Sequence, residues 1–232
     1  MNIVYAVTHD YYEKIRPSVY SLLDHNPDVT LYVLAEDDEL NIELPVEPHV
    51  INISGQQWFT PDSINYNNCF TYVNLVKVCY AELLPVDKVL HLDADTIICD
   101  SLLPFYDTDL SGKWMGAVDE VEGHYHPFGP HYYNMGVVLL NLSQMRLDGI
   151  QQILIDYLNS ASQPWADQDA WNVYGISQDM IVPVDKRYNE NFATGYTNDP
   201  AIVHYCGIRG WWDDRSSQRS EYLRAYRERL AI

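Results

Sequence analysis

The stretch Lys88–Leu102, with the sequence KVLHLDADTIICDSL, predicts the centre of the fold and the site that the rest of the chain serves. Val89, Leu90 and Leu92 form a short apolar run typical of a buried strand, and the run stops at Asp93-Ala94-Asp95. Residues two apart on an extended chain project to the same side, so both carboxylates can converge on one point. The sequence therefore brings two acids together at the end of a core strand.

Two carboxylates this close repel each other unless a cation lies between them. A hard divalent ion, which prefers oxygen ligands, is the natural occupant. The structural alternative is that one aspartate caps a turn and the other faces solvent. The apolar lead-in, together with the return to apolar residues at Thr96-Ile97-Ile98, favours the metal site.

The composition is that of a protein with one substantial core. The chain has 232 residues, of which 47% are hydrophobic, and this length predicts a single domain over residues 1–232. The formal net charge of −19 disfavours nucleic acid and anionic membranes as general partners, because both need a basic surface. The four cysteines show no paired metal-ligand spacing, and no apolar run is long enough to span a membrane. These features predict buried free thiols and a cytoplasmic protein.

The opening segment alternates between strand and helix patterns. Apolar runs predict strands at Ile3–Val7, Leu31–Leu34 and Val50–Ile53. Apolar residues at helical spacing predict a helix over about 15–23, with Pro17 in its first turn. This β-α-β order predicts an α/β fold with a central, mostly parallel sheet flanked by crossover helices.

Ligands bind sheets of this kind at the carboxyl ends of the strands. Thr8, Asp10 and Tyr11 would stand at that end of the first strand. Later apolar patterns predict a helix from about Thr71 to Pro85, strands at Trp114–Val118, Val137–Leu142 and Ala201–Gly207, and a helix at Ile150–Leu158.

Two later segments add polar candidates. Asp167-Gln168-Asp169 opens a further helix, and helix capping explains only one of its acids. His204, in the last predicted strand, is by itself most simply a packed imidazole. Joined to two carboxylates, however, an imidazole completes a ligand set suited to Mn²⁺, with other coordination positions open to phosphate oxygens and water.

The order of these segments resembles glycosyltransferase family 8, which includes glycogenin and the bacterial lipopolysaccharide α-galactosyl- and glucosyltransferases. The segments are Asp93-Ala94-Asp95, Asn134-Met135-Gly136-Val137, Asp167-Gln168-Asp169 and His204-Tyr205-Cys206-Gly207, with Trp212 close behind. Each motif is short, but their joint order is specific, and it spans nearly the whole chain, from Ile3 to about Trp212.

The resemblance implies a GT-A fold: a single Rossmann-like α/β domain that binds a nucleotide-sugar, usually linked to UDP, with Mn²⁺ or Mg²⁺. Asp93, Asp95 and His204 match the family's metal ligands. The positions that match donor-binding residues are Ala6, Thr8, Asp10, Tyr11, Lys77, Ala94, Asn134 and Gly207, with Tyr11 placed to stack on the base and Gly207 in the phosphate-side turn. The positions that match residues around the transferred sugar are Asn134 and the candidate catalytic residues Asp119, Asp167 and Gln168.

The chain departs from the family's pattern at one point. The family usually continues from His-x-x-Gly to Lys-Pro-Trp, whose Lys binds the diphosphate, whereas this chain has Gly207-Ile208-Arg209-Gly210-Trp211-Trp212. Gly210 occupies the Lys position, so we expect Arg209 to take over the phosphate contact, because a guanidinium can bind phosphate oxygens through two hydrogen bonds. The departure puts the affinity for the donor in question.

The implied activity is a metal-dependent, retaining transfer of a hexose from a UDP-sugar to a glycan, lipid-linked or protein acceptor. The metal and Arg209 or Lys77 would stabilise the departing nucleotide, while Asp119 or Asp167 would offset the positive charge on the sugar ring. Two alternatives stay open. The chain could be a catalytically silent relative that binds a nucleotide-sugar or glycan, or Asp93 and Asp95 could be the nucleophile and acid/base of a DxDxT phosphatase.

The C-terminal segment over about 219–232 predicts an amphipathic helix. Tyr222, Leu223, Tyr226 and Leu230 recur at helical spacing, with arginines between them. The plain interpretation is a terminal helix packed on the acidic body. The alternative is a weak peripheral contact with the inner face of a membrane, which would bring the protein to a lipid-borne acceptor.

Overall fold

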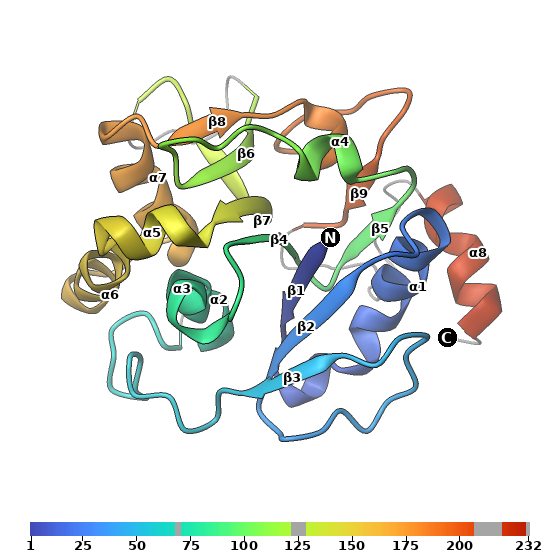
Figure 1. Ribbon diagram of the computed structural model, residues 1–232, viewed down its shortest axis with the longest axis horizontal. Helices are drawn as coiled ribbons and strands as arrows, with labels where there is room; N and C mark the ends of the chain where they lie inside the picture. The colour runs from blue at the N-terminus through green and yellow to red at the C-terminus, as the bar shows by residue number, and fades with distance from the viewer. Residues whose placement is uncertain (68–70, 122–128, 207–219, 231–232) are drawn as a thin grey trace.

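The computed structural model describes residues 1–67, 71–121, 129–206 and 220–230. Its centre is a seven-stranded sheet of order β3-β2-β1-β4-β7-β6-β8 (Figure 1). The strands are β1 (Asn2–Ala6), β2 (Thr30–Ala35), β3 (His49–Asn52), β4 (Lys88–Leu92), β6 (Met115–Asp119), β7 (Tyr133–Asn141) and β8 (Ile181–Pro183). Paired strands run parallel except at β7, which is antiparallel to both β4 and β6. The α/β class and the mostly parallel sheet expected from the sequence are confirmed.

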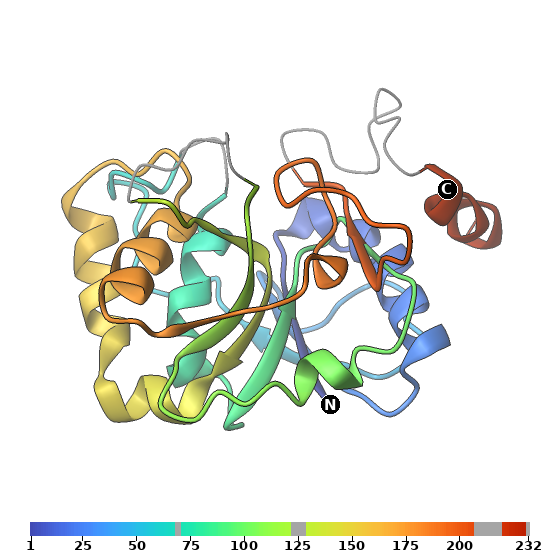
Figure 2. The ribbon, with the colours of Figure 1, turned by 90° about the horizontal axis from the view of Figure 1, so that it is seen from above.

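Two apolar cores cover the sheet, one on each face. Within β1, Val4 packs into one core while Ile3 and Tyr5 pack into the other, as the alternation of side chains along a strand requires. Figure 2 shows the helices gathered on both sides of the sheet. Those of the first core are α2 (Tyr72–Val76), α3 (Tyr80–Leu83), α5 (Leu142–Asp148), α6 (Ile150–Ser160) and α7 (Asp167–Ser177), and those of the second are α1 (Arg16–His25) and α4 (Leu103–Tyr106).

The helix expected from Thr71 to Pro85 is present but is not one regular helix. It consists of α2, a 3₁₀ turn at Lys77–Cys79, and α3, which ends at Leu83. Lys77 lies in the tightened turn and is only 4% exposed, so its ammonium is directed into the protein. Pro17 lies in the first turn of α1, where its missing N–H costs no helical hydrogen bond.

A second, two-stranded sheet joins distant parts of the chain. β5 (Thr96–Ile98) pairs antiparallel with β9 (Ile202–His204), and Thr96 lies opposite His204. The backbone N–H of Tyr205 donates to the carbonyl of Asp95 at 2.9 Å. This pairing brings the imidazole of His204 to the end of β4.

The C-terminal helix α8 (Ser220–Leu230) packs on the body of the protein. Leu223 joins Ile97 in a small buried apolar cluster, and Arg229 Nη1 lies 2.9 Å from Asp24 Oδ2 on α1. The packed terminal helix is therefore confirmed, whereas a membrane contact stays a prediction. Within the described ranges, no helix combines the length and the apolar character needed to cross a bilayer.

Candidate functional site

A pocket of about 550 Å³ opens where the carboxyl ends of β1 and β4 meet the start of β7 and the N-terminus of α7. This volume is in the range of small-molecule sites. The predicted residues that line it are Ala6, Thr8, Tyr11, Lys77, Asp93, Ala94, Asp95, Asn134, Asp167, Gln168 and His204. Segments that are far apart in the sequence thus meet at one edge of the sheet, as the strand order predicts.

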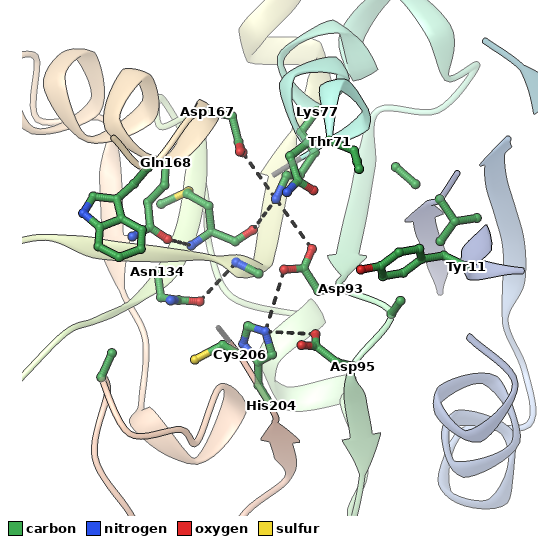
Figure 3. A pocket seen from close by; sticks show the side chains of 18 of the residues that line it. Tyr11, Thr71, Lys77, Asp93, Asp95, Asn134, Asp167, Gln168, His204 and Cys206 are labelled. Atoms are coloured by element: carbon green, nitrogen blue, oxygen red, sulfur yellow. Dashed lines mark hydrogen bonds and ion pairs between the residues drawn. The ribbon is translucent and has the colours of Figure 1, made fainter. Parts of the chain in front are cut away.

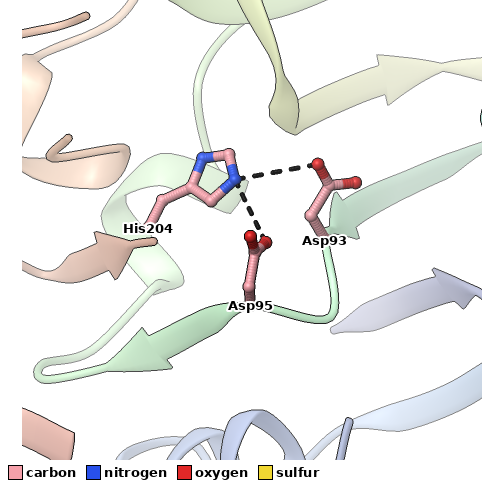
Figure 4. A group of neighbouring side chains, drawn as sticks. All are labelled: Asp93, Asp95 and His204. Atoms are coloured by element: carbon pink, nitrogen blue, oxygen red, sulfur yellow. Dashed lines mark ion pairs between the residues drawn. The ribbon is translucent and has the colours of Figure 1, made fainter. Parts of the chain in front are cut away.

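Asp93, Asp95 and His204, which all line this pocket, point toward one another (Figure 4). His204 Nε2 lies 3.3 Å from Asp95 Oδ1 and 3.7 Å from Asp93 Oδ2, and one potential ligand atom from each of the three residues lies within 4.8 Å of the other two. Two carboxylates and one imidazole are an N/O donor set that suits Mn²⁺ or a similar divalent ion. The three side chains therefore fit the metal that the sequence predicts.

Gly136 makes room for this donor set. Its carbonyl accepts a hydrogen bond from the Asp93 N–H at 2.7 Å, so β7 runs directly against the metal-ligand segment. A Cβ at position 136 would lie 2.1 Å from His204 Cε1 and 2.7 Å from Asp93 Oδ2. No side chain fits there, because these distances are far below van der Waals contact.

A buried ammonium links the Asp93 side chain to α7 (Figure 3). Lys77 Nζ lies 3.3 Å from Asp167 Oδ2 and 3.6 Å from Asp93 Oδ1, and it donates to the Met135 carbonyl at 3.3 Å. Burial disfavours the charged lysine, but the two carboxylates raise the pKa of Lys77 above its ordinary value. Burial likewise disfavours ionised Asp93, yet Lys77 and neighbouring imidazoles hold the pKa of that carboxyl well below its usual range.

Asp167 shares the same ammonium from a more enclosed position, with its side chain 4% exposed. Burial raises the pKa of Asp167 to about 7, since one ammonium offsets the charge of two carboxylates only in part. The residue before it, Ala166, has a positive φ of 52°. A backbone conformation of this kind is costly for alanine, and it lies directly before the first residue of α7.

His91 supports Asp93 from within β4. Its Nε2 lies 2.8 Å from Asp93 Oδ1, and its Nδ1 lies 2.9 Å from the Tyr80 hydroxyl. Burial lowers the pKa of His91 to about 4, so the ring is neutral at pH 7, with Nε2–H donating to the carboxylate and Nδ1 accepting from the tyrosine. His91 thereby orients the Asp93 side chain without adding charge.

This buried imidazole predicts a loss of stability in mild acid. The pKa of His91 is about 6.5 in the unfolded chain and about 4 in the folded protein. The free energy of unfolding that this difference contributes is fully present above pH 6.5 and is lost as the pH falls from 6.5 to 4. His91→Gln, which keeps a donor for Asp93, should flatten the decline. The measurement is the free energy of urea unfolding from pH 4 to 8 for both proteins. Parallel curves would show that His91 does not carry the effect.

Asn134 and Gln168 hold the other side of the pocket. Gln168 Oε1 accepts from the Met135 N–H at 3.0 Å, and the side-chain amides of Asn134 and Gln168 donate to Glu120 Oε1 at 3.2 and 3.3 Å. In Figure 3 these two amides and Tyr11 lie on opposite sides of Asp93. The pocket thus has an aromatic end and a hydrogen-bonding end, with Asp93 between them.

Two predicted residues do not line the pocket. Asp10 is exposed in the short 3₁₀ turn His9–Tyr11. Asp119 Oδ2 lies 2.5 Å from His131 Nδ1, and its Oδ1 accepts from the Tyr132 N–H at 2.9 Å. Glu120, which the sequence reasoning missed, lines the pocket instead. The predicted residues Gly207 and Arg209 lie outside the described residues.

Other pocket residues were also missed, because nothing in their sequence context marks them. They are Val7, Thr71, Asn74, Tyr132, Trp165, Phe192 and Ala193, whereas Cys206, which also lines the pocket, belongs to the motif His204-Tyr205-Cys206-Gly207 that carries the family resemblance. Asn189, buried behind His204, was missed for the same reason.

Comparison with known proteins gives one family and one fold. The model of glycosyl transferase family 8 matches residues 2–215. Two curated relatives from Streptococcus pneumoniae are the glycosyltransferase GlyF, 27% identical with 96% of this chain covered, and GlyA, 26% identical with 93% covered. This chain spans 60% of the length of GlyF and 33% of that of GlyA.

Solved structures support the fold. The galactosyltransferase LgtC, in complex with donor and acceptor sugar analogues, superposes with a TM-score of 0.75 at 22% identity, over 100% of this chain and 97% of that one. GlyE of Streptococcus pneumoniae superposes with a TM-score of 0.71 at 20% identity, over 99% of this chain and 63% of that one. The expected GT-A fold is thereby confirmed.

Proposed function

Because the chain belongs to glycosyl transferase family 8, we propose that it transfers a hexose from a UDP-sugar to a carbohydrate-type acceptor, with a divalent metal ion and with retention of the anomeric configuration. The observation that carries the proposal is the convergence of Asp93, Asp95 and His204 in the middle of a pocket with an aromatic end and a hydrogen-bonding end. A nucleotide-sugar needs these three environments in this order: base, diphosphate and sugar.

The donor would lie across the pocket in that order. Tyr11 offers its ring to the base, next to Ala6 and Thr8 at the end of β1. Asp93, Asp95 and His204 would hold Mn²⁺ or Mg²⁺, which supplies positive charge to the diphosphate. The proposal that Arg209 and Gly207 contact the phosphates concerns residues outside the described ranges, and it stays a prediction.

The chain's own groups would then act on the charges that develop during transfer. When the bond between the anomeric carbon and the diphosphate breaks, its electron pair leaves with the nucleotide, and the sugar ring becomes positive. The buried Lys77 ammonium, which lines the pocket, would stabilise the leaving group, and the carboxylate of Asp167 or Glu120 would offset the charge on the ring. Asn134 and Gln168 offer amide groups to the sugar hydroxyls.

Two exposed aromatic residues suggest where the acceptor enters. Trp165 and Phe192 line the pocket and are 43% and 50% exposed. Aromatic faces of this kind pack against the C–H faces of sugar rings, since both surfaces are apolar. A carbohydrate acceptor, like the acceptor analogue in the LgtC complex, suits this entrance.

The test is binding and turnover with a panel of UDP-sugars. A UDP-sugar donor at a concentration 100 times its Kd, together with Mn²⁺, should raise the Tm by about 5–10 °C, and EDTA should remove this increase. Slow UDP release should accompany this stabilisation and increase with an acceptor. Stabilisation without UDP release would favour the catalytically silent alternative, and hydrolysis of a phosphate ester without UDP release would favour the phosphatase.

A further inference from the structure

A fully buried asparagine lies behind the predicted metal ligand His204. Asn189 follows the 3₁₀ turn Lys186–Tyr188 and is 0% exposed. Its side-chain oxygen lies 2.8 Å from His204 Nδ1, on the side of the ring away from Asp93 and Asp95. The orientation of this one amide decides whether Nδ1 donates or accepts a hydrogen bond, because an amide presents an acceptor on one side and donors on the other.

The first constraint on that orientation comes through Asn134. Its Oδ1 accepts from the backbone N–H of Gly136 at 3.1 Å, and its Nδ2 donates to Glu120 at 3.2 Å. A backbone N–H can only donate and a carboxylate can only accept, so the Asn134 amide has one arrangement. Asn189 must then turn its Nδ2 toward Asn134 Oδ1, at 2.9 Å.

The second constraint is independent and comes through Asn191. Its Oδ1 accepts from the backbone N–H groups of Ala193 and Thr194 at 2.7 and 3.0 Å, which leaves its Nδ2 as the only group that can face Asn189. That Nδ2 donates to Asn189 Oδ1 at 3.1 Å. Both constraints give the same result: the oxygen of Asn189 faces His204, and the nitrogen faces away.

We propose that Asn189 is a positioning residue that holds His204 in the tautomer with a proton on Nδ1 and a lone pair on Nε2. The proposal rests on the proposed function, since it concerns the ligand that would hold the metal. With Nδ1–H committed to Asn189, the lone pair of Nε2 points to the space shared with Asp93 and Asp95. In the other tautomer, an Nε2–H would occupy the space that a cation needs.

A hydrogen bond from the second ring nitrogen also makes a histidine a better ligand, because it fixes the ring and raises its basicity. Here the acceptor is an amide whose own orientation derives from backbone N–H groups on β7 and in the segment after Asn191. The tautomer is therefore set by the fold itself, before any ion arrives.

The test compares two substitutions by Mn²⁺ affinity, measured from the free-ion EPR signal without nucleotide or acceptor. Asn189→Leu removes the acceptor, and we expect it to weaken Mn²⁺ binding by about 10–100-fold. Asn189→Asp restores an acceptor for Nδ1–H, and it should bind Mn²⁺ at least about tenfold more tightly than Asn189→Leu. Asn26→Leu is the matched control, since Asn26 is a buried amide that bonds backbone groups at Asp100 and Leu102, away from the pocket.

Nitrogen-15 NMR tests the tautomer directly in the metal-free protein at alkaline pH, where the ring is neutral. His204, assigned by its absence in His204→Gln, should show a slowly exchanging proton on Nδ1 and none on Nε2. A proton on Nε2, or wild-type Mn²⁺ affinity in folded Asn189→Leu, would overturn the proposal. If Asn189→Leu does not fold, the NMR result decides alone.

The role of Asn189 and the proposed function can be disproved separately. A protein that shows the Nδ1–H tautomer and binds Mn²⁺ but releases UDP from no donor keeps the role of Asn189 and loses the proposed function. A protein that transfers sugar with Nε2 protonated in the metal-free state keeps the function and loses this role.

Discussion

Asp95→Asn should bind Mn²⁺ at least about 100-fold more weakly than the wild type and release UDP about 1,000-fold more slowly, which corresponds to about 4 kcal/mol of lost transition-state stabilisation. Asp95 is buried, and its Oδ1 lies 3.3 Å from His204 Nε2. The amide has the size of the carboxylate, so the change removes the negative charge of a proposed metal ligand and leaves a weaker oxygen donor, while the packing stays the same. The measurements are the free Mn²⁺ EPR signal and the rate of UDP release at saturating donor.

The matched control is Asp100→Asn. Asp100 follows Asp95 in the same stretch of sequence, but its carboxylate pairs with Arg187 at the surface, at 2.8 Å. A surface ion pair contributes little to the free energy of unfolding. This variant should keep both Mn²⁺ affinity and turnover. Full activity of Asp95→Asn with Mn²⁺ would show that the ion does not bind where the three side chains converge.

Gly136→Ala should also weaken metal binding strongly, although glycine has no side chain that could bind a metal. The added Cβ would lie 2.1 Å from His204 Cε1 and 2.7 Å from Asp93 Oδ2, so the imidazole and the carboxylate must separate. We expect Mn²⁺ affinity to fall at least about 100-fold, and overpacking to lower the free energy of unfolding by about 1–3 kcal/mol. The measurements are the Mn²⁺ titration and urea unfolding of the metal-free protein.

Gly55→Ala is the control for this substitution. A Cβ at position 55 would have no heavy atom within 4 Å, so Mn²⁺ affinity and stability should stay near those of the wild type. Wild-type affinity in Gly136→Ala would mean that the segment bearing His204 moves freely, and the proposed metal site would then not be rigid.

The centre of the site was predictable because its chemistry is local in the sequence. An apolar strand that ends in two aspartates, with one small residue between them, directs both carboxylates to one point, and β4 has that arrangement. The association of His204 with them came only from the order of motifs, because no local pattern marks this histidine. Its position depends on the pairing of β5 with β9, which spans a large part of the chain.

Other features could not be predicted from the sequence, for physical reasons. An apolar run indicates a buried strand but not its direction, so the antiparallel course of β7, which brings Gly136 to Asp93, was not foreseen. The sequence also did not show that Glu120, and not the predicted Asp119, lines the pocket. The pairing of β6 with β7 shifts register between Ala117 and Val118, and a shift of this kind changes which residue faces a given side.

The buried asparagines escaped prediction because amides at loop positions usually indicate turns. Asn189 and Asn191 become informative only when their partners are known, since it is the direction of each hydrogen bond that matters.

The roles of Gly207 and Arg209 stay predictions.

The small sheet of β5 and β9 also bears on how the molecule is completed. A chain made from its N-terminus contains both aspartates well before it contains the histidine, and the two parts meet only when Thr96 aligns with His204. A partly synthesised or partly folded chain therefore lacks the assembled set of three side chains. Binding of a divalent ion at the proposed site would require that β5 and β9 have already paired.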